Sequence, residues 1–335
     1  MDSLTPHVKT ERIEWIDTIK AICIFSVLMN HVAFPHDWFH VDFYFMVGFF
    51  FCSGYTFNET YSLKKRFAKI LDQLIIPYMV LTPFEFLIDG DFVRKTISTP
   101  PLGLYELIIT ILCGIRFWFL PCLVSIEVIL SVIFKLRIPY NKYLVMVVCI
   151  TLFCFGVIND SHLPWHIDTA LYGIIFFVFG MILRRREIPA INKYLVMVAA
   201  IAYIVIGNYL YPKMPFNTSL NLYYSNVMMI LMNFVGVVVL IYVSKLLHKN
   251  RIVDFLGRNS LTIYILHIPL LIPTYRLFFR WWSESTFMDN TLTGILCSIV
   301  LVGILYPIIT FLNMKVSWAC GKSKLFYNIM VKNER

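Results

Sequence analysis

An acid, an amine and an imidazole follow one face of the first apolar segment, residues 12–31, whose sequence is RIEWIDTIKAICIFSVLMNH. Lys20 and His31 are eleven residues apart, which in a helix is about three turns or roughly 16 Å, so they share a face. Asp17 falls on the same stripe. An ionisable side chain at the centre of a membrane helix costs about 2.5–3.5 kcal/mol, so such residues usually face the bundle interior and have a function. We expect these three side chains to form a reactive site along this helix face. The alternative is a local Asp17–Lys20 pair near the inner membrane surface and a structural histidine near the outer surface.

Two further ionisable residues lie deep in later apolar segments. Glu127 falls about ten residues into the segment that starts at residue 117, near the bilayer centre. A buried carboxylate needs a partner, so we expect Glu127 either to pair with Lys20 or to orient a histidine. His267 falls about two turns into the segment that starts at residue 260. A lone histidine there is more often structural, but a second histidine, an acid and a lysine in the same bundle favour a substrate contact.

A cluster of cations precedes the third apolar segment in the stretch LKKRFAKILDQLIIPY. Lys65, Arg66 and Lys69 would suit the phosphates of a nucleotide-type donor, because arginine offers a bidentate fork and lysine a mobile point charge. The excess of cations in cytoplasmic loops also explains such a cluster without any ligand. Both interpretations stay open.

Ser53 and Trp118 are candidates for contacts with a substrate. Ser53 lies beside a glycine in the aromatic stretch FFFCSGYTF, where small residues let a neighbouring helix approach closely. Packing alone explains this pair, and a serine lining a substrate path is the alternative. Trp118 opens the fourth segment, as expected of an aromatic residue at the membrane interface.

No metal site is predicted. His162 and His166 have the spacing of a metal-binding pair on a helix, but Pro164 lies between them and argues against a helix there. The eight cysteines form no CxxC pair and lie mostly in apolar segments, which is typical of small core residues.

The composition excludes an ordinary soluble domain. Of 335 residues 59% are hydrophobic and 15% charged, and the mean hydropathy is +0.73, which indicates an all-α polytopic membrane protein. The net charge of +9 does not predict a nucleic-acid partner, because the basic residues come in short clusters between apolar segments.

Ten apolar segments are long enough to be candidate spans of a single membrane domain. They are residues 15–34, 41–59, 70–89, 117–135, 143–159, 168–183, 193–211, 222–244, 260–279 and 292–314. With both termini in the cytoplasm, 22 of the 29 basic residues lie inside, so the positive-inside rule predicts this orientation. No fused soluble domain is expected.

Two other features concern topology. Pro101–Ile115 is short and follows a Pro-Pro break, which predicts an interfacial or re-entrant helix on the outer side. The heptapeptide NKYLVMV occurs at residues 141–147 and 192–198, which favours a duplicated helical hairpin over the fifth to eighth segments.

The stretch from Lys20 to His31 resembles the K/R-x10-H motif of the membrane acyltransferase-3 family. FFFCSGY, KKRFAKILDQLIIPY, FWFLP with Glu127, and LGRNSLTIYILH resemble further stretches of that family, in its order and spacing. WIDTIKAICI and the last of these are most similar to the branch of fucose 4-O-acetylases and related sugar O-acetyltransferases. The resemblance extends over nearly the whole chain.

The resemblance implies a ten-helix bundle that moves an acyl group from cytoplasmic acyl-CoA to a hydroxyl, usually of a glycan. His31 would be the catalytic histidine and Lys20 its basic partner, while Arg66 and Lys69 match the family's basic RxxR element as RxxK. Phe45 stands where relatives often carry a histidine. We expect acetyl-CoA as donor, no metal, and a sugar acceptor on a surface polysaccharide or its lipid-linked precursor, in the bacterial inner membrane.

The side chains on this face of the first apolar segment could carry out such an acyl transfer. A neutral imidazole can take the proton of an attacking hydroxyl, or can itself be acylated and pass the group on. Lys20 and the inner cations would hold the donor's negative charge, and Asp17 would orient Lys20. The competing class is a transporter or flippase for a glycolipid or small solute, with the buried charges as gate or proton relay.

Overall fold

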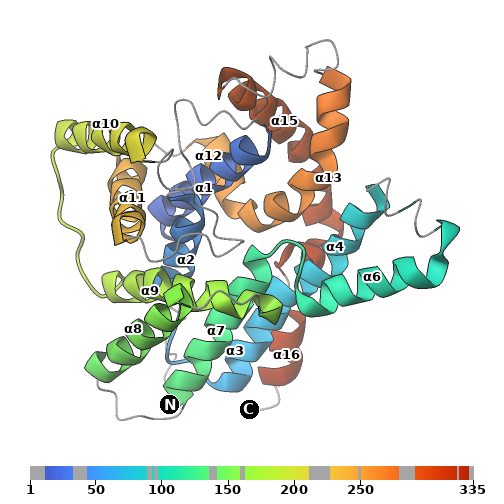
Figure 1. Cartoon of the computed structure of the whole chain (residues 1–335), viewed down its shortest axis with the longest axis horizontal. Helices are drawn as coiled ribbons and strands as arrows, with labels where there is room; N and C mark the ends of the chain where they lie inside the picture. Colours follow the sequence, from blue (N-terminus) through green and yellow to red (C-terminus); the bar gives the residue numbers. More distant parts are fainter. Residues whose placement is uncertain are drawn as a thin grey trace, which may run out of the picture.

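Helices form the part of the chain that the structure describes, and no strand occurs in it. The computed structural model describes residues 12–32, 44–88, 93, 97–135, 142–158, 163–210, 227–247, 250–278, 291–322 and 324–331. The main helices (Figure 1) are α1 (Glu14–Val32), α2 (Phe45–Thr56), α3 (Leu63–Ile70), α4 (Ile76–Ile88), α6 (Pro100–Cys113), α7 (Phe119–Lys135), α8 (Lys142–Ile158), α9 (Ile167–Leu183), α10 (Lys193–Leu210), α11 (Val227–Leu246), α12 (Arg251–Arg258), α13 (Ser260–Phe278), α15 (Thr291–Lys315) and α16 (Leu325–Val331). A π-helical turn, η2 (Leu71–Ile75), joins α3 to α4, and the 3-10 turns are η3 (Pro164–His166) and η6 (Ser317–Cys320).

Each of the ten predicted segments contains a helix, so the all-helical class is confirmed. Five described helical segments are long and apolar enough to cross a membrane: Leu63–Phe86, Pro164–Leu183, Lys193–Leu210, Met228–Leu246 and Gly294–Lys315. The number of ten spans and the side of the termini stay predictions. The third segment was predicted to begin at residue 70, but its helix already begins at Leu63, because LKKRFAKI forms an amphipathic helix capped by Ser62.

Helix α1 lies at the centre of the bundle. It packs against α2, α11, α12, α13 and α15 (Figure 1). Its apolar side chains fill the core, and Ile19, Ile24 and Leu28 are fully buried. The helix that carries Lys20 and His31 is therefore fixed by neighbours on several sides.

A close crossing of α2 and α9 depends on two glycines. A Cβ on Gly54 would lie 1.8 Å from the backbone oxygen of Phe177, and one on Gly180 would lie 2.2 Å from that of Phe51. The two backbones therefore touch where any side chain would separate them. The close helix approach predicted at the Ser-Gly pair is therefore confirmed at Gly54.

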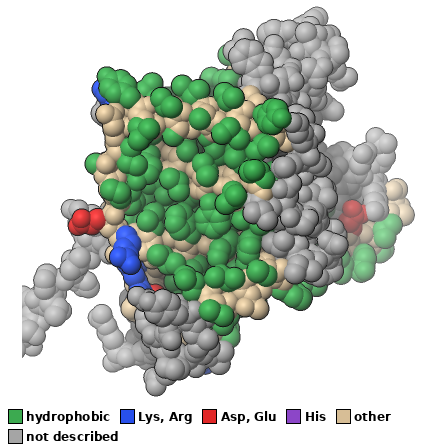
Figure 2. Space-filling model, turned by 60° about the vertical axis from the view of Figure 1, so that its left-hand side comes forward, with side chains coloured by type: hydrophobic (Ala, Val, Ile, Leu, Met, Phe, Trp, Pro, Cys, Tyr) green, Lys and Arg blue, Asp and Glu red, His purple; other side chains and the backbone are tan. Residues whose placement is uncertain are grey.

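The outer surface of α10 and its neighbours is apolar. Figure 2 shows this face covered almost continuously by hydrophobic side chains, with charges at its margin. On α10 the exposed fractions reach 60% at Ile201 and 61% at Val205. Such a surface suits contact with lipid rather than water.

The two copies of the repeat hold equivalent places. Lys142 begins α8 and Lys193 begins α10, and each helix packs against the next one in the chain, α9 and α11. Helix α6 occupies the segment predicted to be an interfacial or re-entrant helix and ends at Gly114, which has a positive φ of 69°. Duplication and the membrane depth of α6 stay predictions.

We predict that Gly54→Ala lowers the free energy of unfolding by about 1–3 kcal/mol or more, because the added methyl group overpacks the α2–α9 crossing. Gly303→Ala on α15 is the matched control, since nothing lies within 4 Å of a Cβ at that position. Thermal unfolding of the purified proteins in detergent measures the difference. Equal stability of the two variants would contradict this account of the crossing.

Candidate functional site

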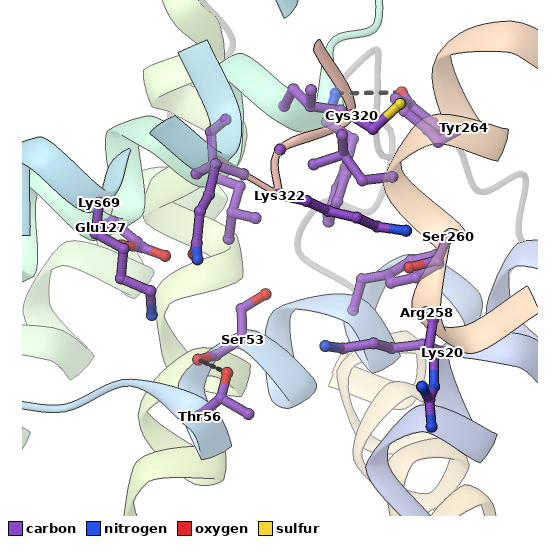
Figure 3. A pocket seen from close by; sticks show the side chains of 18 of the residues that line it. Lys20, Ser53, Thr56, Lys69, Glu127, Arg258, Ser260, Tyr264, Cys320 and Lys322 are labelled. Carbon is purple, nitrogen blue, oxygen red and sulfur yellow. Dashed lines mark hydrogen bonds between the residues drawn. The ribbon is translucent and has the colours of Figure 1, made fainter. Parts of the chain in front are cut away.

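A cavity of about 250 Å³ lies where α1, α2, α3, α7 and α13 meet the turns η2 and η6. Figure 3 shows it from close by. Five cations and one acid line it: Arg12, Lys20, Lys69, Arg258, Lys322 and Glu127. Such an excess of positive charge in an enclosed space attracts anions.

The two arginines of this lining have acidic partners. Arg258 Nε donates to Asp254 Oδ1 at 2.7 Å, and Arg12 forms an ion pair with Asp17. Asp17 was predicted to orient Lys20, and its ion pair is with Arg12, which lies two residues before the start of α1. Lys20 and Lys322 therefore carry the charge that a ligand can use, whereas Lys69 is also attracted by Glu127.

Lys20 and Lys69 extend into the cavity from opposite sides (Figure 3). Lys20 comes from α1 and Lys69 from the last turn of α3. Ser53 of α2 also lines the cavity. Three residues from motifs that are far apart in the sequence therefore line the same cavity.

Glu127 lines the same cavity, and its ion pair is with Arg66, whose Nη1 lies 4.0 Å from Glu127 Oε2. The predicted partners were Lys20 or a histidine. Arg66 reaches Glu127 because α3, which lies beside α7, begins earlier than predicted. Arg66 is 2% exposed, donates to the Asn58 carbonyl, and stacks 3.7 Å above the Phe57 ring.

Arg66 does not line the cavity of Lys20 but an adjacent one of about 330 Å³. Lys65 lies with its ammonium 4.0 Å from the centroid of the Tyr61 ring. Of the three cations predicted to hold a donor, Lys69 is therefore the one that faces Lys20.

Lys322 is a cavity residue that sequence reasoning did not single out. It follows η6, and its Nζ donates to Asn259 Oδ1 at 2.7 Å. Partial desolvation, with the nearby charges of Arg12 and Arg258, lowers the pKa of Lys322 from its ordinary 10.5, although Cys320 opposes the shift. The signal in the sequence was a small-residue turn, ACGKSK, after the last apolar segment.

His31 lies beside His267, three turns along α1 from Lys20. Their ring centroids are 4.9 Å apart. Nδ1 of His267 lies 2.7 Å from the Tyr264 carbonyl and therefore carries the proton, so Nε2 is an acceptor in the neutral ring. This Nε2 is buried, and no group in the described part of the chain hydrogen-bonds to it.

Tyr264 connects the histidines to the cavity. Its ring lines the cavity, its hydroxyl accepts from the Phe119 amide at 3.4 Å, and its carbonyl fixes His267. Trp118 does not line this cavity and lies 6.1 Å, centroid to centroid, from His166. His162 lies outside the described residues.

The chain was compared with known proteins. A family model described as an acyltransferase domain, Acyl_transf_3, matches residues 13–310. The chain belongs to the acyltransferase-3 family. No curated protein and no solved structure matches it significantly.

The family match gives the reaction class, and part of the candidate site lies outside the matched residues. A membrane acyltransferase is supported, and Lys20, His31, Glu127 and His267 all lie in the matched region. The match ends within α15, so η6, Lys322 and α16 lie beyond it. The fucose 4-O-acetylase branch stays a prediction.

We predict that an anionic acyl donor of this acyltransferase binds more weakly as the pH rises through the lowered pKa of Lys322, because the neutral amine no longer attracts the anion. The donor KM should therefore increase at a lower pH than 10.5, the ordinary lysine value. In Lys322→Arg, which stays charged, the increase should shift to higher pH. Lys315→Arg outside the cavity is the control, and identical profiles for all three proteins would exclude this role.

Proposed function

We propose that this protein is a bacterial inner-membrane O-acetyltransferase. It takes the acetyl group of cytoplasmic acetyl-CoA and places it on a sugar hydroxyl of a surface polysaccharide or its lipid-linked precursor. The observation that carries this proposal is one helix, α1, with a lysine in a cation-rich cavity and a histidine three turns further on. The family match to an acyltransferase domain gives the reaction class.

The cavity has the chemistry of a CoA site. CoA carries a diphosphate, and lysine ammonium groups bind phosphate oxygens through strong charge-assisted hydrogen bonds. Lys20, Lys69 and Lys322 supply such donors from three separate elements. Under the predicted orientation this end of α1 faces the cytoplasm, where acyl-CoA is found.

His31 acts as the general base. Its imidazole takes the proton from the sugar hydroxyl as the hydroxyl oxygen attacks the thioester carbonyl carbon. The carbon–sulfur bond then breaks, and the CoA thiolate leaves and is protonated by the imidazolium. Nε2 of His267, beside the His31 ring, offers an acceptor that can fix the orientation of His31.

The acceptor approaches from the end of α1 where His31 lies. His31 is at the C-terminal turn of this helix and is exposed. Under the predicted orientation that end faces the outer surface, where surface glycans and their lipid-linked precursors are found. The apolar outer face of the bundle provides the contact with the bilayer. We expect no nucleic-acid partner.

We predict that His31→Ala lowers kcat by about 10²–10⁴-fold, the contribution typical of a general base, with little change in the donor KM. Membranes with wild-type protein, the variant or an empty vector are compared for release of CoA thiol, and the surface glycan for the mass increment of an acetyl group. The amount of inserted protein is measured by immunoblotting. Full acetylation by a normally inserted variant would refute the role of His31.

A labelled-donor experiment separates the two roles of the histidine. With a general base, rapid quenching of enzyme and [14C]acetyl-CoA in cold detergent at neutral pH leaves no label on the protein, whereas an acylated histidine, which acid would hydrolyse, retains it under these conditions. Label that depends on His31 would replace our mechanism by a covalent one.

We predict the opposite kinetic pattern for Lys20. Lys20→Ala should raise the KM for acetyl-CoA about tenfold or more, because one charge-assisted contact with a phosphate is lost. Lys20→Arg should restore most of the affinity. A fall in kcat alone would show that Lys20 serves the chemical step and not donor binding.

A further inference from the structure

The chain after α15 is docked at two points on η2. Both carboxylate oxygens of Asp72 accept hydrogen bonds at 3.0 Å from backbone amides of α16, those of Phe326 and Tyr327. At the other point, Gly321 has a positive φ of 72°, and a Cβ there would lie 2.8 Å from the Gln73 carbonyl. Lys322 and Lys324, which lie between these points, are therefore held close to the cation-rich cavity.

A second cavity lies on the other side of this docked segment. It has a volume of about 200 Å³ and is lined by Tyr61, Lys69, Asp72, Gln73, Lys324 and Tyr327. Lys69 and Gln73 line both cavities, so the two adjoin. Each is smaller than the roughly 300–1,000 Å³ typical of ligand sites, and joined they reach that range.

The docked segment contributes one lysine to each cavity. Lys322 lines the first and Lys324 the second, while Lys69 reaches both. Asp72 is the acid of the second lining, but both of its oxygens are used by α16. Lys69 and Lys324 together outweigh the one negative charge of Asp72, so the lining of the second cavity also has an excess of positive charge.

The second cavity has aromatic walls, unlike a simple phosphate site. Tyr61 and Tyr327 are half-buried, and the ammonium of Lys65 lies 4.0 Å from one ring centroid and 5.6 Å from the other. Aromatic rings stack on nucleobases, and lysines bind phosphate. The combination suits a nucleotide with a phosphate group.

We propose that this second cavity binds the adenosine 3′-phosphate end of CoA. The inference rests on the proposed function, in which the first cavity holds the diphosphate and the acyl arm. Lys324 and Lys69 contact the 3′-phosphate, and Tyr61 and Tyr327 hold the adenine. The chain beyond the family match thus selects a donor with a 3′-phosphate.

The other neighbouring cavity, which Arg66 lines, is less suitable for this end of the donor. It shares none of its lining residues with the first cavity. Arg66 is already held by Asn58, Glu127 and the Phe57 ring. Arg66 Nη1 has no hydrogen-bond partner among the described residues, but it lies only 4.0 Å from Glu127 Oε2, whose negative charge opposes a bound phosphate.

The test compares acetyl-CoA with 3′-dephospho-acetyl-CoA as donors for the full-length protein in detergent, measured by release of the CoA thiol. Wild-type protein should have a KM about tenfold or more lower for acetyl-CoA. Lys324→Ala should raise the KM for acetyl-CoA by a similar factor and leave that for the dephospho donor unchanged. The matched control, Lys315→Ala, should change neither value, because Lys315 lines neither cavity.

The outcomes separate this inference from the proposed function. Equal KM values of wild-type protein for the two donors, or an equal effect of Lys324→Ala on both, would overturn the assignment of the 3′-phosphate. Tyr327→Leu should raise both KM values together, and an unchanged pair would refute the adenine contact. If wild-type protein releases thiol from neither donor with any acceptor, the proposed function itself fails, and this subsite with it.

Discussion

The position of the site depends on one backbone contact, between α1 and α12. A Cβ on Gly257 would lie 2.2 Å from the Asp17 carbonyl, so the two helices meet where only glycine fits. This contact brings Arg258 to the edge of the cavity beside Lys20, and the next residue, Asn259, accepts the hydrogen bond of Lys322. The register between α1 and α12 therefore decides which cations share the cavity. A larger residue at position 257 would force α1 and α12 apart, and with them Lys20 and Arg258.

Charge pairing inside the bundle leaves Lys20 and Lys322 for the ligand, while Lys69 shares the attraction of Glu127 with Arg66. Each arginine near the site is held by a carboxylate, as in the pairs Arg12–Asp17, Arg66–Glu127 and Arg258–Asp254. A guanidinium suits this task, because it holds several hydrogen bonds in a rigid plane. Lysine has a mobile point charge, and Lys322 keeps its place through a neutral amide alone among the described residues. An anionic donor would supply the charge compensation that the fold does not.

The positions of most helices could be predicted from the apolar composition of the chain. Fewer of the contacts in the candidate site could be predicted from the sequence. The ten apolar segments contain helices because a backbone in an apolar setting must satisfy its hydrogen bonds internally. The motif residues Lys20, Lys69 and Ser53 line one cavity. The sequence predicted that Lys20 and the inner cations serve the same donor, and it offered Ser53 on a substrate path only as the alternative to packing. The partners of Asp17 and Glu127 were missed because spacing shows which residues share a face, and not which helices lie beside that face. Lys322 was assigned only to the cytoplasmic charge excess, since nothing local in a short basic tail indicates that Asp72 holds the helix after it.

The two ends of the site are joined by a pair of neighbouring helices. On α13, Ser260 and Tyr264 line the cavity and His267 follows one turn further on, while α1 presents Lys20 at the same end and His31 beside His267. Between the two ends α1 carries Ile24 and Leu28, which are fully buried. These apolar side chains lie between the cation-rich cavity and the histidine pair on the same helix. In the proposed mechanism the donor's acyl arm would have to pass them to meet the hydroxyl at His31, so the packing of Ile24 and Leu28 would control the transfer as much as the charged residues do.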